Sequence, residues 1–82
     1  MRIYSIYDKK SLKYGPLMTF GNDIMCVRSV EMDMNTSSSI IGSYPHDFCV
    51  MCFGEFNPDD GSISLLSVPE NIYECANFIS KD

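Results

Sequence analysis

The clearest pattern along the chain is a hairpin, in which two apolar runs flank a short polar turn. From Asp47 to Phe56, residues on both faces of an extended strand are mostly apolar, which predicts a strand in the middle of a sheet. Residues 57–61 predict a five-residue turn, with Gly61 at a left-handed corner. Residues 62–66 predict the partner strand, so we expect an antiparallel sheet.

The first twenty residues predict two more extended segments. Arg2 to Tyr7 is rich in β-forming residues and has apolar side chains on both faces. This favours a central strand, or an edge strand that a partner covers. A polar connection follows, and Tyr14-Gly15-Pro16 predicts a turn or bend. Residues 17–20 predict a further short strand or extended segment.

A helix is expected in the middle of the chain. Asn22 or Asp23 can cap the free N–H groups at its start, and the polar run 35–39 ends it near Met34. The residues at helical spacing on its apolar stripe are Met25, Cys26, Ser29, Val30 and Met32. After it, residues 40–45 predict a loop that is anchored by Ile41 and Tyr44.

A second, shorter helix is expected at the C-terminus. Ser67-Val68-Pro69-Glu70 has the form of a capping box, which predicts a helix from Pro69 to Ile79. The expected fold is therefore α+β: a small antiparallel sheet of three to four strands, a helix in the middle of the chain and a short C-terminal helix. The 82 residues are expected to form a single domain, residues 1–82.

The charge is acidic overall but unevenly placed. The formal net charge is −5, whereas proteins that rely on phosphate contacts are usually basic. Residues 1–14 carry four cations against one anion, a net charge of +3, so the remaining residues carry −8. This argues against nucleic-acid binding by the whole surface and leaves a basic N-terminal edge, which is either a binding edge or a solvated surface.

One group of residues at this edge suggests a mechanism. Bases of single-stranded nucleic acid stack on aromatic rings while cations follow the phosphate backbone. The candidate nucleic-acid-binding residues are Arg2, Tyr4, Tyr7, Lys9, Lys10, Lys13 and Tyr14. The alternative is that the tyrosines belong to the core and the lysines only solubilise the chain.

Other chemistry finds little support. Cys49 and Cys52 lie three residues apart beside the only histidine, His46, but on a strand they point to opposite faces, which disfavours zinc. The four cysteines are expected to be buried or half-buried thiols in a reducing cytoplasm. Since no nucleophile, base and orienting group are apparent, we expect no enzyme, and also no metal and no cofactor. No apolar run approaches the length of a membrane span.

The order of several short motifs resembles the small nonstructural protein of gokushovirus-type microviruses, which are phages with single-stranded DNA genomes. The segments that carry the resemblance are Ile3-Tyr4-Ser5-Ile6-Tyr7-Asp8, Tyr14-Gly15-Pro16, Arg28, Tyr44-Pro45-His46-Asp47-Phe48, Gly54-Glu55-Phe56, Asp59-Asp60-Gly61 and Phe78. They follow in register along nearly the whole chain. Asn57 and Pro58 depart from the pattern, which has an acid directly after the Gly-Glu-Phe segment.

The resemblance implies a nonstructural accessory protein that is absent from the virion and acts in viral single-stranded DNA replication, with weak nucleic-acid binding as the expected activity. It implies no catalytic residue. The alternative hypothesis is an acidic protein-interaction module that binds and modulates a host or viral protein, as a host-takeover or anti-defence factor. We expect the protein in the host cytoplasm, not in a membrane. We also expect a homodimer, because two strands with two apolar faces are hard to cover in a small monomer.

Overall fold

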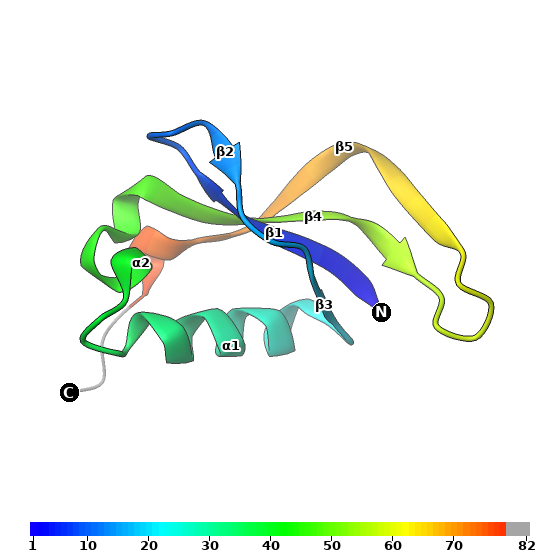
Figure 1. Ribbon diagram of the computed structural model, residues 1–82, viewed down its shortest axis with the longest axis horizontal. Coiled ribbons are helices and arrows are strands. Elements are labelled where there is room, and N and C mark those ends of the chain that lie inside the picture. The colour runs from blue at the N-terminus through cyan, green and yellow to red at the C-terminus, as the bar shows by residue number, and fades with distance from the viewer. Residues whose placement is uncertain (79–82) are drawn as a thin grey trace.

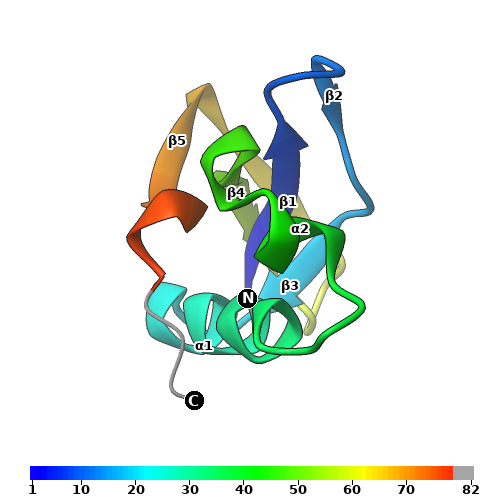
Figure 2. The same ribbon diagram turned by 90° about the vertical axis from the view of Figure 1, so that its left-hand side faces the viewer.

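An antiparallel sheet of five strands is the largest part of the fold within residues 1–78, the part of the chain that the computed structural model describes (Figure 1). The strands are β1 (Arg2–Asp8), β2 (Lys13–Tyr14), β3 (Met18–Phe20), β4 (Phe48–Phe56) and β5 (Ile63–Glu74). Their order is β2-β1-β4-β5, and β3 pairs with β1 as well. Figure 2 shows this order, with β5 at one edge of the sheet.

A single long helix, α1 (Asp23–Met34), crosses one face of the sheet (Figure 1). It begins where predicted, because the Asn22 side chain accepts a hydrogen bond from the Met25 N–H at 2.9 Å. It also ends at the predicted Met34. The remaining helical segments are short: α2 (Ile40–Ser43) and the 3₁₀ turns η1 (Pro45–Asp47) and η2 (Cys75–Asn77).

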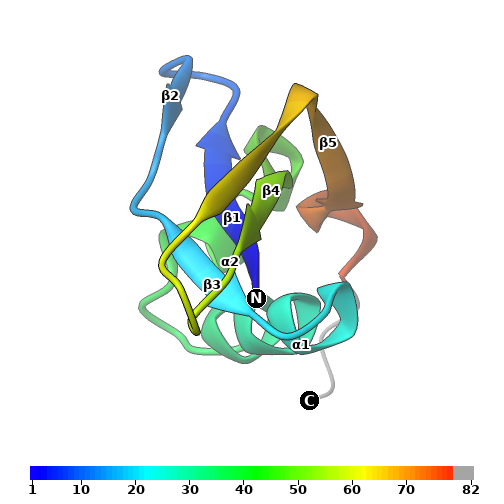
Figure 3. The same cartoon turned by 90° about the vertical axis from the view of Figure 1, so that its right-hand side faces the viewer.

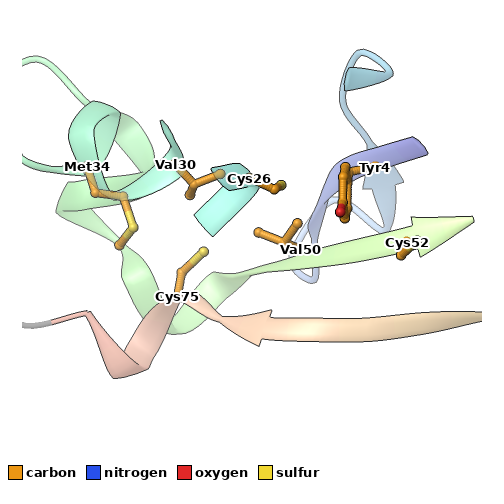
Figure 4. Close-up of a cluster of buried hydrophobic side chains, with 7 residues drawn as sticks. All are labelled: Tyr4, Cys26, Val30, Met34, Val50, Cys52 and Cys75. Atoms are coloured by element: carbon orange, nitrogen blue, oxygen red, sulfur yellow. The ribbon is translucent and has the colours of Figure 1, made fainter. Parts of the chain in front are cut away.

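The core lies between α1 and the sheet. Figure 4 shows its fully packed members, which are Tyr4, Cys26, Val30, Met34, Val50, Cys52 and Cys75. On α1 the buried stripe repeats every four residues, at Cys26, Val30 and Met34. The predicted stripe was correct for Cys26 and Val30 and wrong for Met25, Ser29 and Met32, whose side chains are exposed.

Strand β1 is a central strand of the sheet, which was one of the two predicted alternatives. It pairs with β4 along its whole length and with β2 and β3 on the other side. Its side chains alternate between the faces: Tyr4 and Ile6 pack toward the core and α1, whereas Ser5 and Tyr7 point to the other face of the sheet. Ser5 is itself fully buried, and its hydroxyl donates to the Gly15 carbonyl at 2.8 Å.

The predicted hairpin is confirmed in its position and turn. Strand β4 lies in the middle of the sheet, and the ladder with β5 begins with Phe56 opposite Ile63. Gly61 has a φ of 76°, in the left-handed region that glycine favours. The loop predicted over residues 40–45 instead contains α2 and the start of η1. Of its two predicted anchors, Ile41 packs against the core and Tyr44 is exposed.

The prediction of a C-terminal helix was wrong, and with it the α+β class. The segment that was predicted to start this helix continues β5 to Glu74, and only the turn η2 follows. Glu70 pairs with Cys52 and Glu74 with Cys49, so pairing with β4 overrides the local capping signal. Ile79 lies outside the described residues. Within residues 1–78 the protein is a mostly-sheet domain with one long helix, and its sheet has five strands instead of the three to four that were predicted.

Candidate nucleic-acid interface

Tyr4 belongs to the core. Its side chain is fully buried, and its hydroxyl donates to Asp23 Oδ1 at 2.7 Å, which ties β1 to the first turn of α1. Burial and the hydrogen bond to this carboxylate raise the pKa of Tyr4 well above its ordinary value. Its ring also lies 6.0 Å from that of Phe20, at a tilt of 55°. It has no face available for stacking with a base.

Arg2 is held by two carboxylates. Its Nε lies 2.9 Å from Asp23 Oδ1, and its Nη2 donates to Glu70 Oε1 at 3.1 Å. The Nε–H is buried and is not aligned for a hydrogen bond, so its contact with Asp23 is an ion pair. The guanidinium thus joins β1, α1 and β5, and its charge is already balanced within the chain.

Tyr7 and Tyr14 lie together on the face of the sheet that points away from α1. They are opposite each other in the β1–β2 ladder, with ring centroids 4.6 Å apart. Phe53 of β4 adds an edge-on contact to Tyr14 at 5.3 Å. We call Tyr7, Tyr14 and Phe53 the aromatic triad. Tyr14 is 50% exposed, whereas Tyr7 and Phe53 are less exposed than Tyr14.

Phe53 was missed as a candidate site residue, although the sequence contained a signal for it. Strand alternation in β4 puts Phe53 on the face opposite to Val50 and Cys52. What the sequence did not contain was the pairing of β1 with β4, which brings Phe53 to the β1–β2 hairpin.

The three lysines of the hairpin differ in their surroundings. Lys9 forms an ion pair and hydrogen bond with Glu74 of β5. Lys10 and Lys13 are exposed, and among residues 1–78 neither side chain forms an ion pair. Lys13 directly precedes Tyr14 on β2, so its side chain points to the opposite face of the hairpin from the Tyr14 ring.

Asp8 organises the tip of this hairpin. Its Oδ1 accepts hydrogen bonds from the N–H groups of Lys10 at 2.9 Å and Ser11 at 3.3 Å, and the N–H of Leu12 bonds to the Asp8 carbonyl at 2.8 Å. The bond from Lys10 is the main cause of a lowered Asp8 pKa. Leu12 is exposed at the tip, with a φ of 60°.

The structure therefore brings together a subset of the predicted residues. Tyr7 and Tyr14 form an aromatic surface, and Lys10 and Lys13 place unpaired positive charge on the adjoining end of the hairpin. The predicted residues that lie elsewhere or are already paired are Arg2, Tyr4 and Lys9.

Many of the carboxylates form hydrogen bonds within the chain. Seven carboxylates accept hydrogen bonds from other described residues, namely Asp8, Asp23, Glu31, Asp33, Asp60, Glu70 and Glu74. Glu31, for example, accepts the hydroxyl of Tyr73 at 2.8 Å, which connects α1 to β5. These carboxylates keep their negative charge, but their hydrogen bonds occupy oxygens that a partner would otherwise contact.

The cysteines are buried thiols, as expected. Burial raises the pKa of Cys26 to about 11 and that of Cys75 to about 12, so both stay protonated at neutral pH. Within residues 1–78, no three His, Cys, Asp or Glu side chains converge as metal ligands would. In the same part of the chain, no helix has the length and apolar character needed to cross a membrane.

Comparison with known proteins identifies the family. The family described as Phage ORF5 protein matches residues 1–78. Protein ORF5 of Chlamydia phage 1 is 39% identical over 66 residues, a stretch that covers 74% of this chain and 68% of that protein. No solved structure matches the chain. The chain belongs to the Phage ORF5 protein family and is a small phage protein of the gokushovirus type.

Proposed function

We propose that this protein is a nonstructural accessory factor of viral single-stranded DNA replication, which acts in the host cytoplasm and binds single-stranded DNA weakly. The aromatic triad supplies stacking surface for bases, and Lys10 and Lys13 supply contacts to the phosphate backbone. The observation that carries the proposal is the half-exposed Tyr14, whose ring contacts both Tyr7 and Phe53 on the hairpin that also carries the unpaired Lys10 and Lys13.

Weak binding follows from the size of the site. Stacking contributes roughly 1–3 kcal/mol per base, and Tyr14 is the one triad ring that is half exposed. Two unpaired lysines would release few counterions from the DNA, so its affinity should depend only weakly on salt concentration. A net charge of −5 further opposes the approach of a polyanion.

The alternative, an acidic module that binds and modulates a host or viral protein, has less support. The carboxylates that would form its binding surface are largely engaged within the chain, for example Asp23 with Tyr4 and Glu70 with Arg2. A stoichiometric protein partner recovered from host cells, together with an absence of DNA binding, would favour this alternative.

Fluorescence anisotropy of a labelled single-stranded oligonucleotide at rising salt tests the DNA-binding proposal. We expect Tyr14→Ala to weaken binding by about fivefold or more, the lower limit of one stacked base. Tyr44→Ala, which removes an exposed tyrosine outside the triad, is the matched control and should leave the affinity unchanged.

Charge reversal provides a second arm of the same experiment. Lys13→Glu should reduce binding and also flatten its salt dependence, because it removes one phosphate contact. Arg28→Glu makes the same charge change on the exposed side of α1 and serves as the control. Equal losses for both variants would mean that net charge alone governs binding, and no binding at low salt would end the proposal.

A further inference from the structure

Within residues 1–78, no strand pairs with the outer edge of β5. β5 pairs with β4 on one side and is the last strand in the order of the sheet (Figure 2). Asn57 donates its N–H to the Ser62 carbonyl at 2.9 Å, so the backbone groups of Ser62 point toward β4. Because successive residues of a strand direct their backbone groups to opposite edges, Ser64 bonds toward β4, whereas Ile63 and Leu65 direct their N–H and C=O groups outward.

Aliphatic side chains crowd the same part of the strand. Ile63 is 59% exposed, Leu65 73%, Leu66 44% and Val68 73%. An open edge that also carries exposed aliphatic side chains is a template for pairing with another strand. Natural monomers usually protect such an edge with lysines or inward-pointing charges, and residues 61–68 contain no charged residue.

The bend in β5 limits the usable edge to its first arm. Figure 3 shows the two arms of the strand meeting at a sharp angle, and the register with β4 shifts there. Pro69, which lacks an N–H group, lies in this register shift, between Leu65 and Glu70. The first arm, residues 63–66, is therefore the segment that can accept a new strand.

We propose that two copies of this chain pair antiparallel through the first arm of β5, which makes one continuous sheet across a two-fold axis. Such pairing is self-complementary, since the same donors and acceptors on Ile63 and Leu65 face their counterparts in the other copy. It would also bring the exposed side chains of Ile63, Leu65 and Leu66 against the second copy.

The charge distribution favours a second copy over a foreign partner. Two molecules of net charge −5 repel each other, so an uncharged surface favours their close approach, and the first arm is such a surface. A basic foreign protein would be drawn to carboxylates, which this arm lacks. The dimer does not depend on the proposed DNA binding, because none of its residues belongs to the aromatic triad.

Sedimentation equilibrium over a micromolar concentration range tests the dimer. The wild-type chain should show a concentration-dependent monomer–dimer equilibrium, and Leu65→Lys should shift it toward monomer by tenfold or more in dissociation constant. Leu17→Lys places the same charge on a residue that is 71% exposed outside the arm, and it should leave the equilibrium unchanged.

A second variant tests the backbone pairing itself. Leu65→Pro removes an N–H group that points away from β4, so the fold keeps its ladder and the dimer loses a hydrogen bond. Circular dichroism should show an intact sheet in each variant. A wild-type chain that stays monomeric, or a Leu65→Lys variant that dimerises as the wild type does, would overturn the proposal, as would a monomer that binds a foreign peptide along this edge.

Discussion

Individual residues show how far composition and spacing could define the site. Tyr4, Tyr7 and Tyr14 are equivalent in the sequence as ring-bearing residues near lysines, yet Tyr4 is buried and the other two form the triad. Alternation along β1 separates Tyr4 from Tyr7, but which face carries the helix is decided by residues far along the chain. The nearby charges Arg2 and Lys9 were likewise unpredictable, because their partners are distant in sequence.

Leu12 is the residue at which a single change should stabilise the protein. Its φ of 60° lies in the left-handed region, which disfavours a bulky side chain, and the side chain is exposed. We expect Leu12→Asn to raise the free energy of unfolding by up to about 1 kcal/mol, because asparagine tolerates this conformation. Urea denaturation measures the change. Leu17→Asn, an exposed leucine with ordinary φ, should give no such gain, and an equal gain in both would show that strain is not the cause.

Individual elements show where local signals were sufficient and where they failed. The cap of α1 and the turn before β5 depend on neighbouring residues, so Asn22 and Gly61 could be recognised from the sequence. Residues 67–70 have a helix-capping pattern, and the ladder with β4 makes the segment that follows a strand. A tertiary contact of this kind has no local signal that the sequence could reveal.

The β4–β5 hairpin should be far more sensitive at Gly54 than at Gly61. A Cβ added at Gly54 would lie 2.0 Å from the Ser64 carbonyl oxygen and 2.9 Å from the Leu65 Cα, at a φ of +153°. At Gly61 the φ is +76° and the space is open. We expect Gly61→Ala to cost about 1 kcal/mol of unfolding free energy, and Gly54→Ala to cost several times more. Chemical denaturation compares them, and similar costs would contradict the close approach of β5 to Gly54.

The contact between Lys9 and Glu74 joins the basic hairpin to β5 and should make stability depend on pH. The hydrogen bonds from Lys9 and Asn71 lower the pKa of Glu74. A carboxyl whose pKa is lower in the folded state stabilises the fold above its unfolded pKa, and this contribution is lost as the pH falls through the folded pKa. Urea midpoints from pH 7 to pH 3 should fall less in Glu74→Gln than in the wild type. The exposed control Glu55→Gln should follow the wild type, and identical profiles for both variants would rule out this contact as a cause.

At the scale of the whole molecule, the net charge of −5 does not describe how charge is distributed. Carboxylates such as Asp23, Glu31 and Glu74 bond to partners on other elements, whereas Lys10 and Lys13 form no ion pair within residues 1–78. The unpaired lysines and the aromatic triad meet at the β1–β2 hairpin, and β2 lies at the opposite edge of the sheet from β5.

The proposed dimer would combine the two surfaces. Strands paired antiparallel about a two-fold axis perpendicular to the sheet keep the same face of each copy on the same side. Both aromatic triads would then point to one side of the continuous sheet, and one DNA strand could contact both. Two weak sites joined in this way bind a long strand more tightly than either site alone.

The most direct test of the account is an NMR titration of the labelled protein with a single-stranded oligonucleotide, which follows aromatic ring and backbone amide signals together. We expect the largest shifts at the rings of Tyr7, Tyr14 and Phe53 and at the amides of Lys10 and Lys13, with Tyr44 unaffected. Shifts centred on α1, or no shifts at low salt, would contradict the claim that this face of the sheet binds single-stranded DNA.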